Sequence, residues 1–261
     1  MLLVIDVGNT NIVLGIYDGR RLVCNWRIHT ERNSTEDEFN ALIRNLFAND
    51  GIRPGDIQQT IISSVVPPMV GILDAFCLKY LGRAPHWVDA KSAGVMPIRY
   101  SNPAEVGADR IVNAVAAYHQ YHCALIVIDF GTATTFDAIS AAGEYLGGAI
   151  APGIMISAEA LFQKASKLPR VEIFRQPESV IGTDTISSIQ SGIICGYAGL
   201  VDGMVARMRQ ELGGTAKTVA TGGLAPLIQR AATAIEAVSP DLTLEGLRLI
   251  WEKIESRGAR D

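Results

Sequence analysis

The chain has 261 residues, of which 48% are hydrophobic and 19% charged, and its formal net charge is −4. This composition is typical of a folded globular protein long enough for two modest domains, and it excludes a disordered chain. The small negative charge gives no reason to expect nucleic acid or an anionic membrane as a partner.

The first half of the chain is predicted to fold in the order β-β-β-α-β-α-β. Alternation of apolar and polar residues predicts strands at 2–6, 12–18, 21–28, 60–66 and 86–88. The capping-box spacing of Thr35 and Glu38 predicts a helix through 39–50, and a second helix is expected at 69–81. A turn-rich segment from Ser92 onwards is expected to form a loop.

The second half repeats the arrangement of strands followed by helices. A helix is predicted at 109–121, and strands follow at 124–129, 134–140, 145–150 and 217–221. Further helices are expected at 153–166, 184–212, 224–237 and 242–256. The repeated order predicts an internal duplication. The expected domains are 1–117 and 118–261, with the final helix packing on the first.

An acidic residue closes an apolar strand at the start of each half, before glycine and a cluster of small polar residues. The copies are Asp6-Val7-Gly8-Asn9-Thr10-Asn11 and Asp129-Phe130-Gly131-Thr132-Ala133-Thr134-Thr135. An alternating apolar segment follows each copy, so both are predicted to be β-hairpins. A tight turn with hydroxyl and amide donors suits phosphate, and the carboxylate suits the cation that phosphates carry. The two hairpins therefore predict a nucleotide held between the halves.

Rival nucleotide-binding folds are excluded, because the chain has neither a Walker-type P-loop nor a dinucleotide-binding glycine fingerprint. Residues 6–19 contain no lysine or arginine before Arg20, so a metal ion is expected to neutralise most of the triphosphate. Asp6 and Asp129 are the expected metal carboxylates. Asp137 is a weaker third candidate, since its place in the strand alternation also fits a solvated position. The turn Thr221-Gly222-Gly223 suits close approach to adenine or ribose, or simply a capped helix start.

Nothing in the sequence indicates export or membrane insertion. The start of the chain lacks the basic leader of a secretory signal, and no apolar stretch approaches the roughly 20 residues that span a bilayer. The four cysteines have no close spacing. They are expected to be reduced thiols in a cytoplasmic protein rather than zinc ligands or disulfides.

Three signatures in order resemble type III pantothenate kinase: the first hairpin turn, the second hairpin turn, and the segment Asn102-Pro103-Ala104-Glu105-Val106-Gly107-Ala108-Asp109-Arg110 between them. The resemblance extends through Gly147–Gly153 and Gly182–Thr185 and so covers most of the chain. It implies an α/β fold of duplicated ribonuclease-H-like (actin-like) domains with a nucleotide cleft between them. The implied activity is ATP-dependent phosphorylation of pantothenate, the first step of coenzyme A biosynthesis. A homodimer, magnesium and a monovalent cation (potassium or ammonium) are implied too.

The same resemblance implies roles for individual residues. ATP contacts are expected at Asp6, Val7, Gly8, Asn9, Thr10, Asn11, Ile12, Val13 and Thr132. Pantothenate contacts are expected at Tyr100, Gly107, Ala108, Asp109, Arg110 and Thr185. Asp109 resembles the proton acceptor and Asp129 the ligand of the monovalent cation, whereas the place of Asp6 inside the phosphate turn favours magnesium.

Alternatives to this interpretation stay open at the level of the sequence. Asp109 and Arg110 also fit a plain helix start joined by an ion pair. The same fold could phosphorylate another small hydroxylated metabolite, or could serve a nucleotide-dependent regulator without turnover. A side chain placed like Asp109 argues against the regulator, because a nucleotide switch does not need a base beside a substrate loop.

Overall fold

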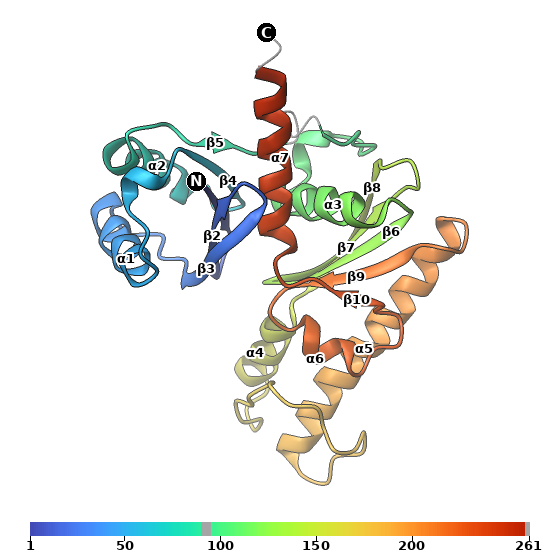
Figure 1. Ribbon diagram of the computed structural model, residues 1–261. Helices are drawn as coiled ribbons and strands as arrows, with labels where there is room; N and C mark the ends of the chain where they lie inside the picture. Colours follow the sequence, from blue (N-terminus) through green and yellow to red (C-terminus); the bar gives the residue numbers. More distant parts are fainter. Residues whose placement is uncertain (90–94, 259–261) are drawn as a thin grey trace. The chain divides into compact units, whose positions relative to one another are not determined.

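The structure is a computed structural model that describes residues 1–89 and 95–258, so part of the expected loop after Ser92 and the last three residues lie outside it. The chain divides into two compact units, and each contains one five-stranded sheet (Figure 1). Unit 1 comprises Met1–Met96, Ser101–Ala116 and Leu242–Asp261, and unit 2 comprises Pro97–Tyr100 and Ala117–Asp241.

The sheet of unit 1 has the strand order β3-β2-β1-β4-β5. Its strands are β1 (Leu2–Val7), β2 (Asn11–Asp18), β3 (Arg21–His29), β4 (Gln59–Ser64) and β5 (His86–Trp87). The strands β1 to β3 form an antiparallel meander, whereas β4 runs parallel to β1 and β5 parallel to β4. The end of β1 therefore has the hairpin strand β2 on one side and the end of β4 on the other.

Helices cover both faces of this sheet. They are α1 (Glu36–Asn49), α2 (Pro68–Phe76) with a π-helical turn at Cys77–Leu81, and α7 (Leu242–Gly258); α3 (Ala108–Tyr121) begins in unit 1 and ends in unit 2, and short 3-10 turns lie at Pro54–Asp56 and Pro103–Glu105. Phe39 of α1 and Phe76 of α2 join the buried cluster that contains Ile5 of β1. On the other face lies α7 (Figure 1), whose Leu244 is next to Gly15 of β2.

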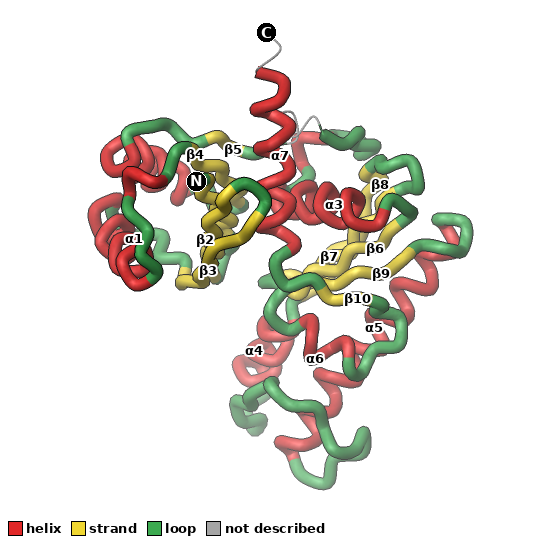
Figure 2. The backbone as a smooth tube through the Cα atoms, viewed as in Figure 1, coloured by secondary structure: helices red, strands yellow, loops and turns green. Residues whose placement is uncertain are grey.

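The sheet of unit 2 has the order β10-β9-β6-β7-β8. Its strands are β6 (Leu125–Phe130), β7 (Ala133–Ile139), β8 (Tyr145–Pro152), β9 (Lys217–Thr221) and β10 (Ala237–Val238), and its helices are α4 (Ile154–Lys164), α5 (Thr185–Glu211) and α6 (Ala225–Gln229). Residues of these helices pack with Ile126, Ile128 and Phe136 in one buried cluster. A loop without regular structure joins α4 to α5 (Figure 2).

The two sheets have the same plan. If β1 to β5 are matched in order with β6 to β10, the strand orders are identical, and so are the parallel and antiparallel pairings. Both predicted hairpins, β1–β2 and β6–β7, are present. The predicted internal duplication of an α/β unit is therefore confirmed, although the two halves share little sequence outside the hairpins.

The segment Pro97–Tyr100 belongs to unit 2, which corrects a simple division of the chain at residue 117. Its backbone follows the start of β8: the N–H of Arg99 donates to the carbonyl of Tyr145 at 2.7 Å, and the guanidinium of Arg99 contacts Glu144 at 2.6 Å. These bonds connect residues more than 40 positions apart, which a local sequence pattern does not reveal.

The prediction of one helix over 224–237 is wrong for its C-terminal part, because α6 ends at Gln229. The carboxylate of Asp202 accepts hydrogen bonds from the backbone N–H groups of Thr233 and Ala234, at 3.1 and 2.8 Å. The N–H of Glu236 then donates to the carbonyl of Thr218. These long-range bonds replace helical ones and bring the chain to the sheet edge as β10.

The expectation that no segment is apolar enough to span a bilayer is also corrected. Among the described residues, α5 is long and apolar enough by length and composition alone. Its glycines and serines interrupt any continuous apolar run, so the sequence shows no long apolar stretch there. Ile194, Val201 and Val205 of this helix are fully buried in the core of unit 2, as in the core helix of a globular protein.

Candidate active site

The first acidic turn joins β1 to β2 at one end of the unit 1 sheet. The N–H of Gly8 donates to the carbonyl of Asn11 at 3.0 Å, which closes the turn. Asn9 and Thr10 at its tip are exposed, whereas Val7 and Ile12 on either side are buried in the core. The buried pair anchors the hairpin and leaves the polar side chains and backbone of the tip open to a ligand, as a phosphate-binding turn requires.

Asp6 lies one residue before the end of β1 and is half-buried. In the parallel register its partner on β4 is Ser63, whose hydroxyl donates to the Asp6 carboxylate at 2.5 Å. Ser63 is fully buried. The hydrogen bond fixes one oxygen of the carboxylate at the base of the turn.

The second acidic turn joins β6 to β7 and is one residue shorter than the first. It lies between the paired residues Phe130 and Thr134, whereas the first lies between Val7 and Ile12. The N–H of Gly131 donates to the carbonyl of Ala133 at 3.0 Å. Asp129 is opposite Thr221 of the parallel strand β9, just as Asp6 is opposite Ser63. Each turn therefore has a carboxylate beside a hydroxyl residue of the neighbouring parallel strand.

Two glycines enclose the second turn closely. A methyl group on Gly222 would lie 2.6 Å from the carbonyl oxygen of Phe130 and 2.8 Å from Oδ1 of Asp129. A methyl group on Gly153 would lie 2.1 Å from the carbonyl oxygen of Thr132. Only a residue without a side chain allows these close approaches. The expected adenine or ribose turn at Gly222 thus lies directly against the Asp129 carboxylate.

Asp137 is not a solvated position, which corrects the sequence interpretation. Its side chain is fully buried and accepts a hydrogen bond from the hydroxyl of Tyr145 at 2.7 Å. The hydroxyl of Thr135 donates to its other oxygen at 3.3 Å. The two donors allow a polar side chain to stay in the interior, so Asp137 is accounted for as a buried, hydrogen-bonded residue of β7.

Asp109 lies in the first turn of α3, in unit 1, next to Gly107, Ala108 and Arg110 of the same signature. Its Oδ1 accepts a hydrogen bond from the N–H of Arg110 at 2.8 Å. A methyl group on Gly107 would lie 2.5 Å from that oxygen, so glycine leaves room for the carboxyl group. Burial raises the pKa of Asp109, and the hydrogen bond and charge of Arg110 oppose the shift without cancelling it. A carboxylate with a raised pKa is a better proton acceptor.

Tyr100 and Thr185 both belong to unit 2 but lie far apart within it. A methyl group on Gly147 would lie 3.5 Å from the ring of Tyr100, so this ring is near Gly147 of β8. Gly147 in turn shares a cavity of about 340 Å³ with Met204 and Met208, near the C-terminal end of α5. Thr185 is the first residue of α5, 19 positions before Met204. At 1.5 Å per residue the helix separates these two positions by roughly 28 Å.

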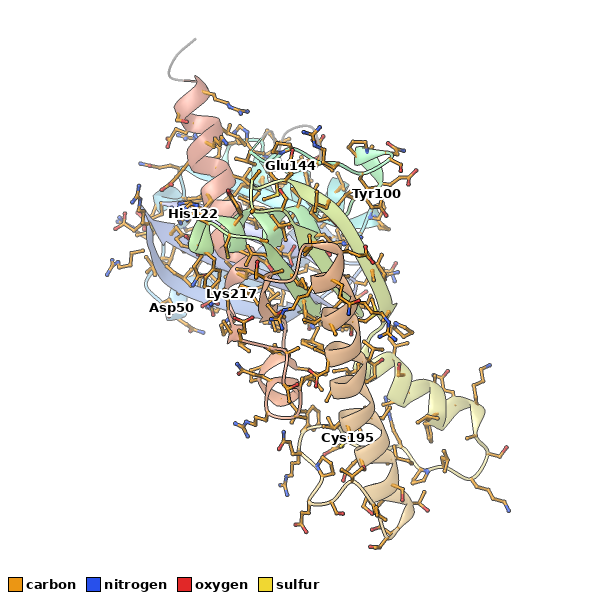
Figure 3. All side chains as sticks on the ribbon, turned by 90° about the vertical axis from the view of Figure 1, so that its right-hand side faces the viewer. Asp50, Tyr100, His122, Glu144, Cys195 and Lys217 are labelled. Carbon is orange, nitrogen blue, oxygen red and sulfur yellow. The ribbon has the colours of Figure 1, made fainter. Side chains whose placement is uncertain are left out.

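The labelled residues in Figure 3 show the same separation. Tyr100 lies near the start of β8, whereas Cys195 lies well away from it, part-way along α5 toward the start of that helix. Thr185 lines a second cavity of about 670 Å³, together with Leu161 of α4 and Ser188 of α5.

Known proteins of high sequence similarity match this chain over nearly its full length. The family model of type III pantothenate kinase matches residues 2–207. A type III pantothenate kinase from Desulfatibacillum aliphaticivorans is 63% identical over 256 residues, which cover 98% of this chain and 100% of the relative. One from Desulforapulum autotrophicum is 63% identical over 262 residues and covers 100% of both chains.

The chain belongs to the type III pantothenate kinase family.

Solved structures with less similar sequences show the fold of this family member. A Baf family transcriptional activator from Campylobacter jejuni has a TM-score of 0.61 at 18% identity, covering 97% of this chain and 99% of its own. Component A of the (R)-2-hydroxyglutaryl-CoA dehydratase of Acidaminococcus fermentans has a TM-score of 0.54 at 18% identity, covering 95% and 94%. The predicted fold of duplicated ribonuclease-H-like (actin-like) domains is therefore confirmed.

Some residues around the turns of this pantothenate kinase family member were missed by sequence reasoning. Ser63 stands in a strand that was predicted, but its register against Asp6 was not. Thr30 and Arg32, in the loop between β3 and α1, contact the first turn through Gly8 and Asn9. The only feature of the sequence that marks this loop is the capping box after it. The capping box shows where α1 begins, and therefore where the loop ends.

Proposed function

We propose that this chain is an ATP-dependent pantothenate kinase, which transfers the γ-phosphoryl group of ATP to the 4′-hydroxyl of pantothenate in the first step of coenzyme A biosynthesis. The observation that carries the proposal is the 63% identity, over full length, to two relatives named type III pantothenate kinase. The duplicated fold supports it, since each unit contributes an acidic turn suited to a phosphate tail.

Phosphoryl transfer needs positioning and charge stabilisation more than covalent chemistry. In our proposal the first turn, from Asp6 to Val13, binds the phosphates of ATP through the exposed side chains and backbone of its tip. Thr132 of the second turn contributes another ATP contact. Both turns are anchored by buried neighbouring residues, so they lose little conformational freedom when they bind ATP.

Asp109 is the proposed proton acceptor for the pantothenate hydroxyl. Its raised pKa and its position at the start of α3, next to Gly107, support this role. General bases of this kind contribute about 10²–10⁴-fold to the rate. Tyr100, Ala108 and Arg110 are the proposed contacts to the remainder of pantothenate.

The residues of the two turns fit the expected cations. Within the described part of the chain, no three His, Cys, Asp or Glu side chains are grouped for a metal ion. A single carboxylate with water and phosphate oxygens is a common way to hold Mg²⁺, so Asp6 fits this ion. The carboxylate of Asp129 and the carbonyl of Phe130 both lie close to Gly222. They offer the oxygen ligands that suit potassium or ammonium. Such cations supply charge neutralisation for the triphosphate.

We further propose that the kinase is a homodimer. Several large apolar side chains of unit 2 are exposed on α4, on the loop after it and at the start of α5: Met155, Ile156, Phe162, Phe174, Val180, Ile181 and Ile186. Apolar groups exposed in this number are typical of an interaction surface. The separation of Thr185 from Tyr100 within one chain supports the same conclusion, because both can contact one pantothenate only if a second copy supplies Thr185.

We propose that the enzyme is located in the cytoplasm. This agrees with its four free cysteines, Cys24, Cys77, Cys123 and Cys195, because disulfides are rare in that compartment. Its partners are ATP and pantothenate. The net charge of −4 gives no support for nucleic acid or a membrane surface as another partner.

The test is the formation of 4′-phosphopantothenate by the purified chain with ATP, magnesium, potassium and pantothenate. We expect product at a rate typical of a metabolic kinase, with less when sodium replaces potassium. Phosphorylation of a different alcohol in place of pantothenate would assign the fold to another metabolite. Tight ATP binding without any product would instead indicate a nucleotide-dependent regulator.

A further inference from the structure

The loop from Thr30 to Ser34 lies directly against the first acidic turn. The hydroxyl of Thr30 donates to the carbonyl of Gly8 at 2.7 Å, and its backbone N–H donates to the carbonyl of Thr10 at 3.0 Å. Thr30 is 5% exposed, so these bonds are shielded from water. The position of the loop relative to the turn is therefore fixed from both sides of the turn tip.

Arg32 follows two residues later and reaches the tip of the turn. Its Nη2 donates to Oδ1 of Asn9 at 2.8 Å. Arg32 is exposed, and among the described residues no carboxylate lies within 4.0 Å of its guanidinium. Some exposed arginines are ion-paired instead: Arg53 pairs with Asp56 at 2.9 Å and Arg99 with Glu144 at 2.6 Å. Arg32 thus brings a positive charge with only a neutral amide partner to the turn.

The turn itself lacks this charge, because no lysine or arginine occurs between residues 6 and 19. A guanidinium presents a planar set of N–H donors that matches phosphate oxygens, and a hydrogen bond between two charged groups is stronger than one to an amide. An exposed guanidinium held by an amide oxygen is therefore ready to exchange that partner for phosphate.

We propose that Arg32 is a phosphate-binding residue of the ATP site. When ATP binds, its guanidinium leaves Asn9 for the polyphosphate tail and supplies the positive charge that the turn does not contain. The inference rests on the proposed function, since it takes the first turn as the phosphate site. It changes the expectation that a metal ion neutralises most of the triphosphate, because Arg32 would share that charge neutralisation.

The test compares Arg32→Ala with Arg44→Ala, an exposed arginine of α1 that serves as the matched control. Affinities for ATP with magnesium and for adenosine are measured by calorimetry. Loss of a hydrogen bond to a charged group should weaken ATP binding by about tenfold or more in Arg32→Ala. Adenosine binding, the KM for pantothenate and the melting temperature should match those of the control, because none of them involves the phosphate contact.

Three results would overturn the proposal. ATP affinity equal to that of Arg44→Ala would show that Arg32 does not touch the nucleotide. An equal loss for adenosine and ATP would show that Arg32 only ties the loop to the turn. Equal ATP affinities of Arg32→Lys and Arg32→Ala would exclude a role for the positive charge. A failure of the proposed function is distinguishable, since wild-type protein would then bind ATP at no measurable level or form no product.

Discussion

The proposed catalytic role of Asp109 comes with a cost in stability. Burial raises its pKa, so ionising the carboxyl group in the folded chain is less favourable than in the unfolded chain. The stability that the protonated form contributes is fully present below the ordinary aspartate pKa of 3.8 and is lost as the pH rises through the raised value. At neutral pH, where Asp109 of the unfolded chain is ionised, the raised pKa therefore lowers the stability of the folded enzyme.

Replacing Asp109 by asparagine should consequently have opposite effects on rate and stability. We expect Asp109→Asn to lower kcat by about 10²–10⁴-fold, because the proton acceptor is lost. Its melting temperature should exceed that of the wild type at neutral pH, and the difference should shrink as the pH falls toward 3.8. Thermal unfolding across this pH range and steady-state kinetics measure both.

The matched control is Asp56→Asn, because the hydrogen bonds from Arg53 lower the pKa of Asp56. The stability that Asp56 contributes is present above its unfolded pKa and is lost as the pH falls through the folded value. This variant should gain no stability at neutral pH and should keep its activity. A melting temperature of Asp109→Asn below that of the wild type at neutral pH would contradict the burial argument.

The positions of single residues were predicted correctly where neighbouring residues in the sequence determine them. The position of Asp6 and Asp129 at strand ends follows from the alternation of apolar residues around them. By contrast, the burial of Asp137 depends on Tyr145 of the neighbouring strand, and the Ser63 contact depends on a parallel register. Both are set by strand pairing, which the order of residues within one strand does not specify.

The turn between β9 and α6 is the element that shapes the proposed cation site. Gly222 has a φ of +93°, and a methyl group there would meet the Phe130 carbonyl and the Asp129 carboxylate. Gly214 has a similar φ of +100° but open space around it. Alanine should cost about 1–2 kcal/mol of stability at Gly214 through backbone strain alone.

We therefore expect Gly222→Ala to raise the potassium concentration needed for half-maximal activity, whereas Gly214→Ala should leave it unchanged. The reason is that the new methyl group must displace the carboxylate that is proposed to hold the cation. Kinetic titration with potassium chloride at constant ionic strength measures this. Equal potassium dependence of the two variants would contradict the placement of the cation at Asp129.

Helices and strands were predicted correctly where nearby residues determine them, and less well where distant residues do. The capping box of Thr35 and Glu38 is present as predicted, and α1 begins where it indicates. The helix expected at 224–237 failed because Asp202, more than 30 residues earlier, captures the backbone N–H groups of Thr233 and Ala234. A hydrophobic pattern cannot report a competing hydrogen bond from a distant helix.

At the scale of the whole molecule, the exposed apolar residues of unit 2 predict the oligomeric state. Ile181 is 80% exposed and Phe174 is 64% exposed. The double variant Phe174→Asp, Ile181→Asp should convert a dimer to a monomer, because each carboxylate would lose its hydration in the interface. Light scattering after size-exclusion chromatography gives the mass directly.

The control for this prediction is Leu78→Asp, since Leu78 is 57% exposed but belongs to unit 1. It should keep the wild-type mass and activity. If Thr185 acts on the partner's pantothenate, the monomeric variant should also lose activity. A double variant with the wild-type mass would contradict the interface, and a monomeric but fully active one would contradict the shared site.

The duplicated fold was predictable from the recurrence of one pattern, a strand ending in an acid followed by a hairpin. The assignment of Pro97–Tyr100 to unit 2 was not, because it depends on pairing with β8 across a stretch of more than 40 residues.

The most direct test of the account is a crystal structure of the enzyme with a non-hydrolysable ATP analogue, magnesium and pantothenate. We predict that the phosphate tail contacts the turn from Gly8 to Asn11 and also Thr132, with the pantothenate hydroxyl within hydrogen-bonding distance of Asp109. A nucleotide bound away from both acidic turns, or a pantothenate whose hydroxyl points away from Asp109, would contradict it.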